Sequence, residues 1–153
     1  MPNHCYNRVE IYGGGLDQIK EIKEKLKGEK TCFDFNNIVP IPKELEGSVA
    51  SEFQQEYWQE NVGYPNEKDL FEARRLRKEY GHDNWYDWCR DNWDTKWNSY
   101  TARLEEEEDG LHYEFDTAWG PPIKVIEALR KQYPDLSITA FYDEPGCAIA
   151  GYY

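Results

Sequence analysis

Lys96 stands between two tryptophans, Trp93 and Trp97, in the most aromatic part of the chain. An ammonium group framed by indole rings is held by cation–π attraction, and a nearby carboxylate adds a charge-assisted contact. Asp116 lies on a strand that can bring it towards Lys96, and Trp119 follows on the same strand. These five residues form the predicted binding site, which suits a small anionic ligand or a peptide carboxylate.

The same residues also have a purely structural interpretation. The indoles would cover the sheet face that the helices leave open, and Lys96 and Asp116 would form an ordinary ion pair. The sequence favours this interpretation, because a single sheet needs a cover wherever its second face is apolar.

No pattern in the chain predicts a reaction or a metal centre, so we expect no catalytic residue, no metal ligand and no cofactor. The three histidines are isolated, and the four cysteines lie too far apart for a zinc motif or a disulfide framework, which predicts reduced and mostly buried thiols. His112 shares a strand face with Glu114 and Asp116, which leaves an acid–base pair open. An enzyme would use Lys96, Asp116 and His112.

Charge argues against nucleic acid and membranes as direct partners. The formal net charge of −12 opposes attraction to phosphates and to anionic lipid surfaces. The run Gly13–Gly15 lacks the register of a phosphate-binding loop and predicts a connecting turn. The compact basic cluster predicts a solvated helix face or internal salt bridges; it consists of Arg74, Arg75, Arg77 and Lys78. The sequence shows neither a signal-peptide pattern nor an apolar run long enough to span a membrane, so we expect a cytoplasmic protein.

The periodicity of apolar residues predicts the elements that must position the site. Alternation predicts strands over 5–12, 32–41, 100–104, 111–119, 136–142 and 147–153. Helical spacing predicts helices over 16–26, 85–94 and 123–133. Asp109 and Gly110 predict a two-residue hairpin turn, and residues 43–80 predict a helical segment that is broken at 63–66.

This order of elements predicts an α+β fold, a ferredoxin-like sandwich in which helices gather on one face of a largely antiparallel sheet. The length suits a single domain, so we predict one ferredoxin-like domain over 1–153 with residues 43–98 as a mainly helical insertion.

Several short motifs, in order along the chain, resemble the YubB-like ferredoxin-like family. They are Pro2–Asn7, Phe33–Asn36, Asn92–Trp97, Phe115–Pro122 and Glu144–Gly146. The resemblance implies a plasmid- or phage-borne bacterial protein with a ferredoxin-like domain. It implies a fold and a genomic setting, but it supplies no catalytic residue.

Three classes of function stay open. The predicted one is a non-catalytic binding module of a mobile element, which presents an aromatic surface to an unidentified host or phage protein. The alternative is an acidic mimic of nucleic acid that inhibits a host DNA-binding or defence protein, and the third is an unrecognised enzyme. The oligomeric state is not predicted.

Overall fold

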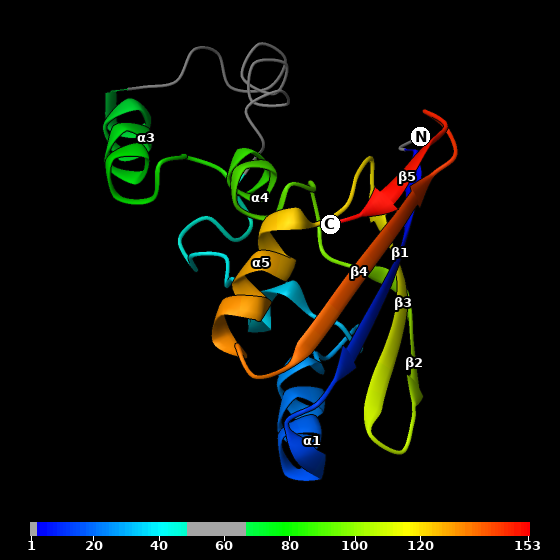
Figure 1. Ribbon diagram of the computed structural model, residues 1–153. Helices are drawn as coiled ribbons and strands as arrows, with labels where there is room; N and C mark the ends of the chain where they lie inside the picture. The colour runs from blue at the N-terminus through cyan, green and yellow to red at the C-terminus, as the bar shows by residue number, and fades with distance from the viewer. Residues whose placement is uncertain (1–2, 49–66) are drawn as a thin grey trace. The chain divides into compact units, whose positions relative to one another are not determined.

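The computed structural model describes residues 3–48 and 67–153 (Figure 1). The chain forms two compact units, which we call the sheet unit (residues 1–40 and 93–153) and the helical unit (residues 41–92). The predicted segment 43–98 overlaps the helical unit, and its nature as an insertion into one domain stays a prediction. The predicted break at 63–66 lies outside the described residues.

The sheet unit contains a five-stranded sheet with the strand order β2-β3-β1-β4-β5, in which all neighbours are antiparallel. The strands are β1 (His4–Tyr12), β2 (Tyr100–Glu106), β3 (Gly110–Ala118), β4 (Ser137–Glu144) and β5 (Ile149–Tyr152). Helices α1 (Gly15–Leu26) and α5 (Ile123–Gln132) lie on the same side of this sheet (Figure 1). The α+β prediction is confirmed.

Alternation along the strands gives the sheet one buried and one outer face. In β1 the residues Cys5, Asn7, Val9 and Ile11 are buried, while those between them are partly exposed. The helices contribute the opposite side of the core with Ile19, Ile22, Leu26, Val125, Ile126 and Leu129. The core therefore lies between the sheet and the two helices, and the outer face carries partly exposed charged and aromatic side chains.

The two edges of the sheet differ. Edge strand β2 is interrupted by a register shift between Tyr100 and Arg103, where Thr101 has a φ of 52°. Edge strand β5 has only four residues, with the sequence Ile-Ala-Gly-Tyr and no charged side chain.

The predicted strand over 32–41 is wrong. Its middle is a 3-10 helix, η1 (Phe35–Asn37), and Asp34 caps it by accepting a hydrogen bond from the Asn36 N–H at 2.9 Å. The Ile38 N–H donates to the Phe35 carbonyl at 3.0 Å. Short polar side chains that bond to the local backbone compete with strand pairing, so the aromatic alternation here reflects burial in a loop.

The β2–β3 hairpin is confirmed, but its turn lies one residue earlier than predicted. The Glu107 N–H donates to the Gly110 carbonyl at 3.0 Å, which leaves Glu108 and Asp109 at the centre of the turn. Gly110 belongs to β3, where a Cβ atom would lie 2.3 Å from the Tyr12 ring. Close approach to β1, rather than turn geometry, requires this glycine.

The helical unit contains α3 (Glu67–Tyr80) and all but the last residue of α4 (Trp85–Trp93). The predicted helix over 85–94 is confirmed. Asn84 starts α4: its side-chain oxygen accepts from the Asp87 N–H at 2.9 Å, and its amide donates to the Asp87 carboxylate at 2.9 Å. This reciprocal pair satisfies an otherwise unpaired backbone donor at the helix start. Over the described residues, no helix is long and apolar enough to cross a membrane.

Replacing Gly110 with alanine should lower the free energy of unfolding by about 1–3 kcal/mol, because the new methyl group overlaps the Tyr12 ring. Gly120→Ala is the matched control, since no atom lies within 4 Å of the position that its new methyl group would take. Urea denaturation of both variants tests the difference. Equal stability of the two variants would contradict the close-approach argument.

Candidate functional site

Trp93 is a buried anchor rather than a surface residue. Its side chain is 1% exposed, its ring meets the Phe35 ring edge-on at 5.5 Å, and its Nε1–H donates to the Val39 carbonyl at 2.8 Å. Phe35 in turn contacts Phe115 on the buried face of β3. Trp93 therefore packs on the helix side of the sheet, and the interpretation in which the indoles cover the outer face does not hold for it.

The residues that follow Trp93 are bonded to the end of β3 and to the segment 33–35. We call residues 93–99 the clip segment. The Thr95 hydroxyl donates to the Ala118 carbonyl at 2.9 Å, and the Asn98 side-chain oxygen accepts from the Phe35 N–H at 2.9 Å. The Ser99 hydroxyl donates to the Phe33 carbonyl. These contacts hold both ends of the segment and leave its centre at the surface.

Asp94 links the clip segment to α5. Its carboxylate accepts from the Lys124 N–H at 3.0 Å, in the first turn of α5, and its other oxygen lies 3.8 Å from the Lys124 ammonium. Pro122, at the N-cap position, makes no side-chain cap bond. Asp94 has a φ of 63°, a left-handed conformation that aspartate tolerates better than most residues. A residue far away in the sequence thus caps this helix.

Lys96 lies between two indole rings, as predicted, but the second ring is not the predicted one. Its Nζ atom is 4.0 Å from the centre of the Trp97 ring and 4.2 Å from that of Trp119. The two side chains are 38% and 45% exposed. We call these three residues the Lys96 clamp. Its role in binding stays a prediction.

Trp119 reaches this position through an unusual backbone conformation. Its φ is 72°, and its N–H donates to the Asn3 carbonyl at 2.9 Å. The neighbouring Thr117 hydroxyl donates to the Gly120 carbonyl at 2.7 Å, which closes the turn around Trp119. The end of β3 therefore directs this indole towards Lys96, a feature that strand alternation does not reveal.

Asp116 is part of the outer face and is not joined to Lys96. Strand register places it beside Tyr6 of β1 and Tyr100 of β2. Among the residues that the structure describes, no ion pair connects Asp116 with Lys96. Of the five predicted site residues, the structure brings together Lys96, Trp97 and Trp119.

His112 occupies the outer face between two carboxylates. Its Nδ1 atom is 3.5 Å from Glu10 and its Nε2 atom is 3.6 Å from Glu114, so the predicted proximity to Glu114 is confirmed. Asp116 is four residues further along β3, about 13 Å at the usual strand rise. His112 and Asp116 therefore do not converge on one reacting atom.

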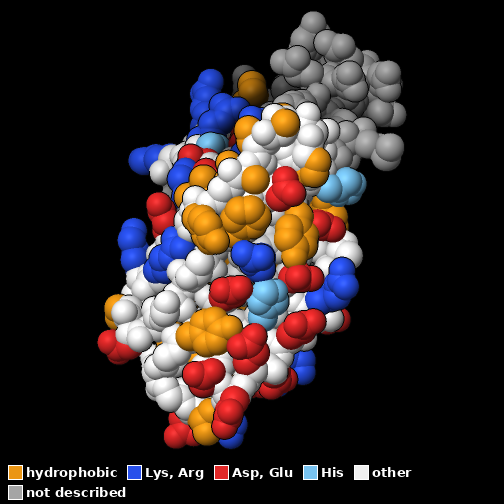
Figure 2. Space-filling model, turned by 45° about the vertical axis from the view of Figure 1, so that its right-hand side comes forward, with side chains coloured by type: hydrophobic (Ala, Val, Ile, Leu, Met, Phe, Trp, Pro, Cys, Tyr) orange, Lys and Arg blue, Asp and Glu red, His pale blue; other side chains and the backbone are white. Residues whose placement is uncertain are grey.

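A tyrosine stabilises one of these carboxylates. A hydrogen bond from the Tyr6 hydroxyl lowers the pKa of Glu114, and the bond from His112 adds to the effect. Burial and this hydrogen bond together raise the pKa of Tyr6 to about 12. Figure 2 brings the strand side of the molecule forward and shows carboxylates interspersed with hydrophobic side chains.

The cysteines are free, as predicted, and Cys5 and Cys89 are buried. Burial raises the pKa of Cys5 to about 11 and that of Cys89 to about 12. Cys147 is exposed, and a hydrogen bond to Glu144 raises the pKa of its thiol. Each of these thiols is thus disfavoured as a thiolate nucleophile at neutral pH. No group of three potential metal ligands occurs within the described ranges.

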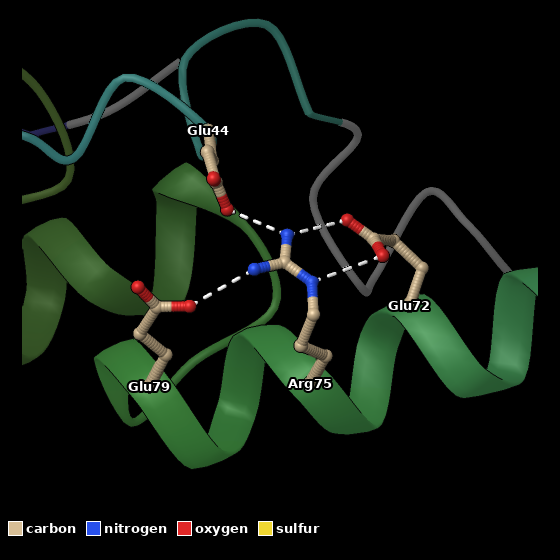
Figure 3. A network of polar contacts seen from close by, with 4 residues as sticks. All are labelled: Glu44, Glu72, Arg75 and Glu79. Atoms are coloured by element: carbon tan, nitrogen blue, oxygen red, sulfur yellow. Dashed lines mark hydrogen bonds and ion pairs between the residues drawn. The ribbon is translucent and has the colours of Figure 1, made fainter.

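Two members of the basic cluster on α3, Arg75 and Arg77, form salt bridges. The Arg75 guanidinium lies 2.6 Å from Glu44, 2.6 Å from Glu72 and 2.9 Å from Glu79 (Figure 3). Arg77 pairs with the Asp83 carboxylate in the same unit. These contacts support the salt-bridge interpretation of the cluster.

Asp94→Ala should destabilise the protein by about 1–2 kcal/mol, because it removes a helix cap and places alanine in a left-handed conformation. Asp94→Asn should retain most of the stability, since its amide oxygen can still accept the bond. Asp109→Ala, in the exposed hairpin turn, serves as control and should change little. Thermal unfolding measures all three, and an Asp94→Asn variant as unstable as Asp94→Ala would contradict the capping role.

Tyr6→Phe should raise the pKa of Glu114 towards its ordinary value of 4.5, because the main stabilising hydrogen bond is lost. A lowered carboxyl pKa stabilises the fold above the unfolded value, and this contribution disappears as the pH falls through the folded pKa. The wild type should therefore lose more stability than Tyr6→Phe on acidification through this range.

NMR titration of the Glu114 carboxyl group measures the pKa change directly. Tyr12→Phe is the matched control, because Tyr12 donates to Glu107 at 2.8 Å instead. An unchanged Glu114 pKa in Tyr6→Phe would contradict the proposed cause.

Comparisons with known proteins bear on the fold. Residues 92–153 match the family model described as "Ferredoxin-like domain in Api92-like protein". Among solved structures, the crystal structure of a protein api92 from Yersinia pseudotuberculosis is similar, with 10% identity over 99% of this chain and 93% of that chain, and a TM-score of 0.57. No curated protein matches. The ferredoxin-like prediction is thereby confirmed, and residues 92–153 are similar to the ferredoxin-like domain of Api92-like proteins.

Proposed function

We propose that the protein is a non-catalytic protein-binding module whose contact surface is the Lys96 clamp. The observation that carries this proposal is the pair of partly exposed indoles, Trp97 and Trp119, held on either side of one ammonium group. Tryptophan is enriched among the residues that dominate the energy of protein interfaces. The two rings would supply apolar contact, and Lys96 would meet a carboxylate of the partner.

The backbone of Trp119 gives independent support. A left-handed conformation costs a non-glycine residue roughly 1–2 kcal/mol, and such outliers concentrate at functional sites. Here the unfavourable conformation keeps a large apolar ring at 45% exposure.

The clip segment would lower the cost of binding. Trp93, Thr95 and Asn98 fix the backbone on both sides of Lys96 through bonds to the sheet unit. Ordering a loop or a side chain on association costs free energy, so a surface that is already ordered binds more tightly. In this proposal Trp93 supports the clamp from the core, and Asp116 would contact the partner from the outer face of the sheet, apart from the clamp.

The resemblance to the YubB-like family supports a setting for this function. We propose an accessory protein of a bacterial plasmid or phage that acts in the cytoplasm on a host or phage protein. Residues 43–98 would be a mainly helical insertion in a single ferredoxin-like domain over 1–153.

Mimicry of nucleic acid is the second candidate. The observation that favours it is the β2–β3 hairpin tip, where five successive acidic residues from Glu105 to Asp109 are all exposed. Together with the net charge of −12, this tip could present carboxylates where a DNA-binding protein binds phosphates.

Capture of partners from a bacterial lysate tests both functions, with the double variant Trp97→Ala/Trp119→Ala. Tyr152→Ala is the control, since it removes a 70% exposed aromatic ring from β5 of the same unit. We expect wild type and control to retain one protein in about 1 M salt, where exposed charges are screened. The double variant should bind that purified protein at least about 30-fold more weakly, as for a hot spot worth about 2 kcal/mol.

Unchanged binding by the double variant would refute the clamp as the contact surface. Binding that disappears at high salt, and that is lost when Glu105–Asp109 are replaced by their amides, would establish mimicry instead. Circular dichroism of each variant shows that the fold is intact.

A further inference from the structure

The outer face of the sheet is organised in rows that cross the strands. One row, fixed by the strand register, contains two tyrosines and two aspartates in alternation. We call it the tyrosine–aspartate row; it runs through Tyr100 of β2, Asp116 of β3, Tyr6 of β1 and Asp143 of β4. Asp143 is exposed and the other three are partly exposed. Tyr6 thus has a carboxylate on the strand at either side.

The adjacent part of the outer face shows what this combination of groups binds. The Arg8 guanidinium lies 5.2 Å from the centre of the Phe141 ring and 3.6 Å from the Glu10 carboxylate. His112 likewise lies between Glu10 and Glu114. Arg8 thus lies beside one carboxylate and one aromatic ring, and His112 lies between two carboxylates.

Among the described residues, no cation pairs with the two carboxylates of the tyrosine–aspartate row, although His4 Nδ1 lies 2.5 Å from the Tyr100 hydroxyl and the charges of Arg8 and Arg103 act on Tyr6. Within residues 3–48 and 67–153, no ion pair reaches Asp116 or Asp143. Both carboxylates can therefore accept a cation from a partner, whereas the carboxylates beside them are already paired in part. A cationic group would gain ion pairing with the carboxylates and cation–π attraction from the tyrosine rings.

We propose that the tyrosine–aspartate row binds a cationic segment of a protein, with two arginine or lysine side chains placed on Asp116 and Asp143. This inference rests on the protein-binding function proposed above and names the chemistry of the partner. The surface would repel the phosphates of a nucleic acid, so charge complementarity selects a basic polypeptide.

The spacing of the row suggests a form for the segment. Asp116 and Asp143 are separated by two strand intervals, about 10 Å in total. In a polyproline II helix, residues three apart lie on the same side and about 9 Å from each other. An Arg-Pro-Pro-Arg sequence therefore places both guanidinium groups at a suitable distance.

The test is an NMR titration of the isotope-labelled full chain with a peptide of about ten residues that contains Arg-Pro-Pro-Arg. We expect the amide signals of Tyr6, Asp116 and Asp143 to shift. The isosteric variant Asp116→Asn/Asp143→Asn should weaken binding on the order of tenfold or more, as expected when charged hydrogen bonds are lost.

Matched controls separate a local contact from overall charge. Glu108→Gln/Asp109→Asn makes the same change in net charge at the exposed hairpin tip and should weaken binding by less than about threefold, because screening limits distant charges. A peptide with glutamine in place of both arginines should not bind. Thermal unfolding verifies that both double variants fold.

Absence of shifts at millimolar peptide, an equal loss of affinity in the two double variants, or shifts of the same residues with a single-stranded RNA oligonucleotide would each overturn the inference. The outcome is distinguishable from failure of the Lys96 clamp. The two tests use different variants and different ligands, so peptide binding without a clamp-dependent partner refutes only the clamp, and a clamp-dependent partner without peptide binding refutes only the row.

Discussion

The burial of one indole, Trp93, anchors the clip segment that carries Lys96. Trp93 packs against Phe35, and its indole N–H donates to the Val39 carbonyl. These two contacts fix both the position and the rotation of the ring. The chain that leaves this anchor is bonded to the end of β3 through Thr95 before it enters β2. Lys96 is partly exposed, and the residues on both sides of it are held in place.

The sequence predicted those parts of the fold in which local pattern and tertiary structure agree. Strand β1 and the β2–β3 hairpin alternate between core and solvent, and this alternation is visible in the residue types. Alternation wrongly predicted a strand at Phe33 and Phe35. Two buried rings separated by Asp34 occur equally well in a loop whose side chains form hydrogen bonds with its own backbone. Hydrophobic periodicity reports burial, and it reports strand pairing only where no local hydrogen bonds compete.

The candidate site was harder to predict than the fold, because its geometry depends on contacts between distant residues. The density of tryptophans around Lys96 predicts that its ammonium contacts indole rings. That one of these rings belongs to Trp119 depends on a backbone turn at the end of β3. The cap that Asp94 provides for α5 acts across 30 residues, and no helix-start pattern reveals it. Likewise, only the register of the strands places Asp116 and Asp143 on either side of Tyr6.

The two edges of the sheet differ in how readily another strand could pair with them. At β2, the left-handed Thr101 and the register shift disturb the regular row of backbone donors and acceptors that another strand would need. At β5, Ile149 and Tyr152 are exposed, and neither a charge nor a proline interrupts the strand. A sixth strand, whether from a longer chain or from another molecule, would therefore extend the sheet beside β5, at the end of the layer opposite the acidic hairpin.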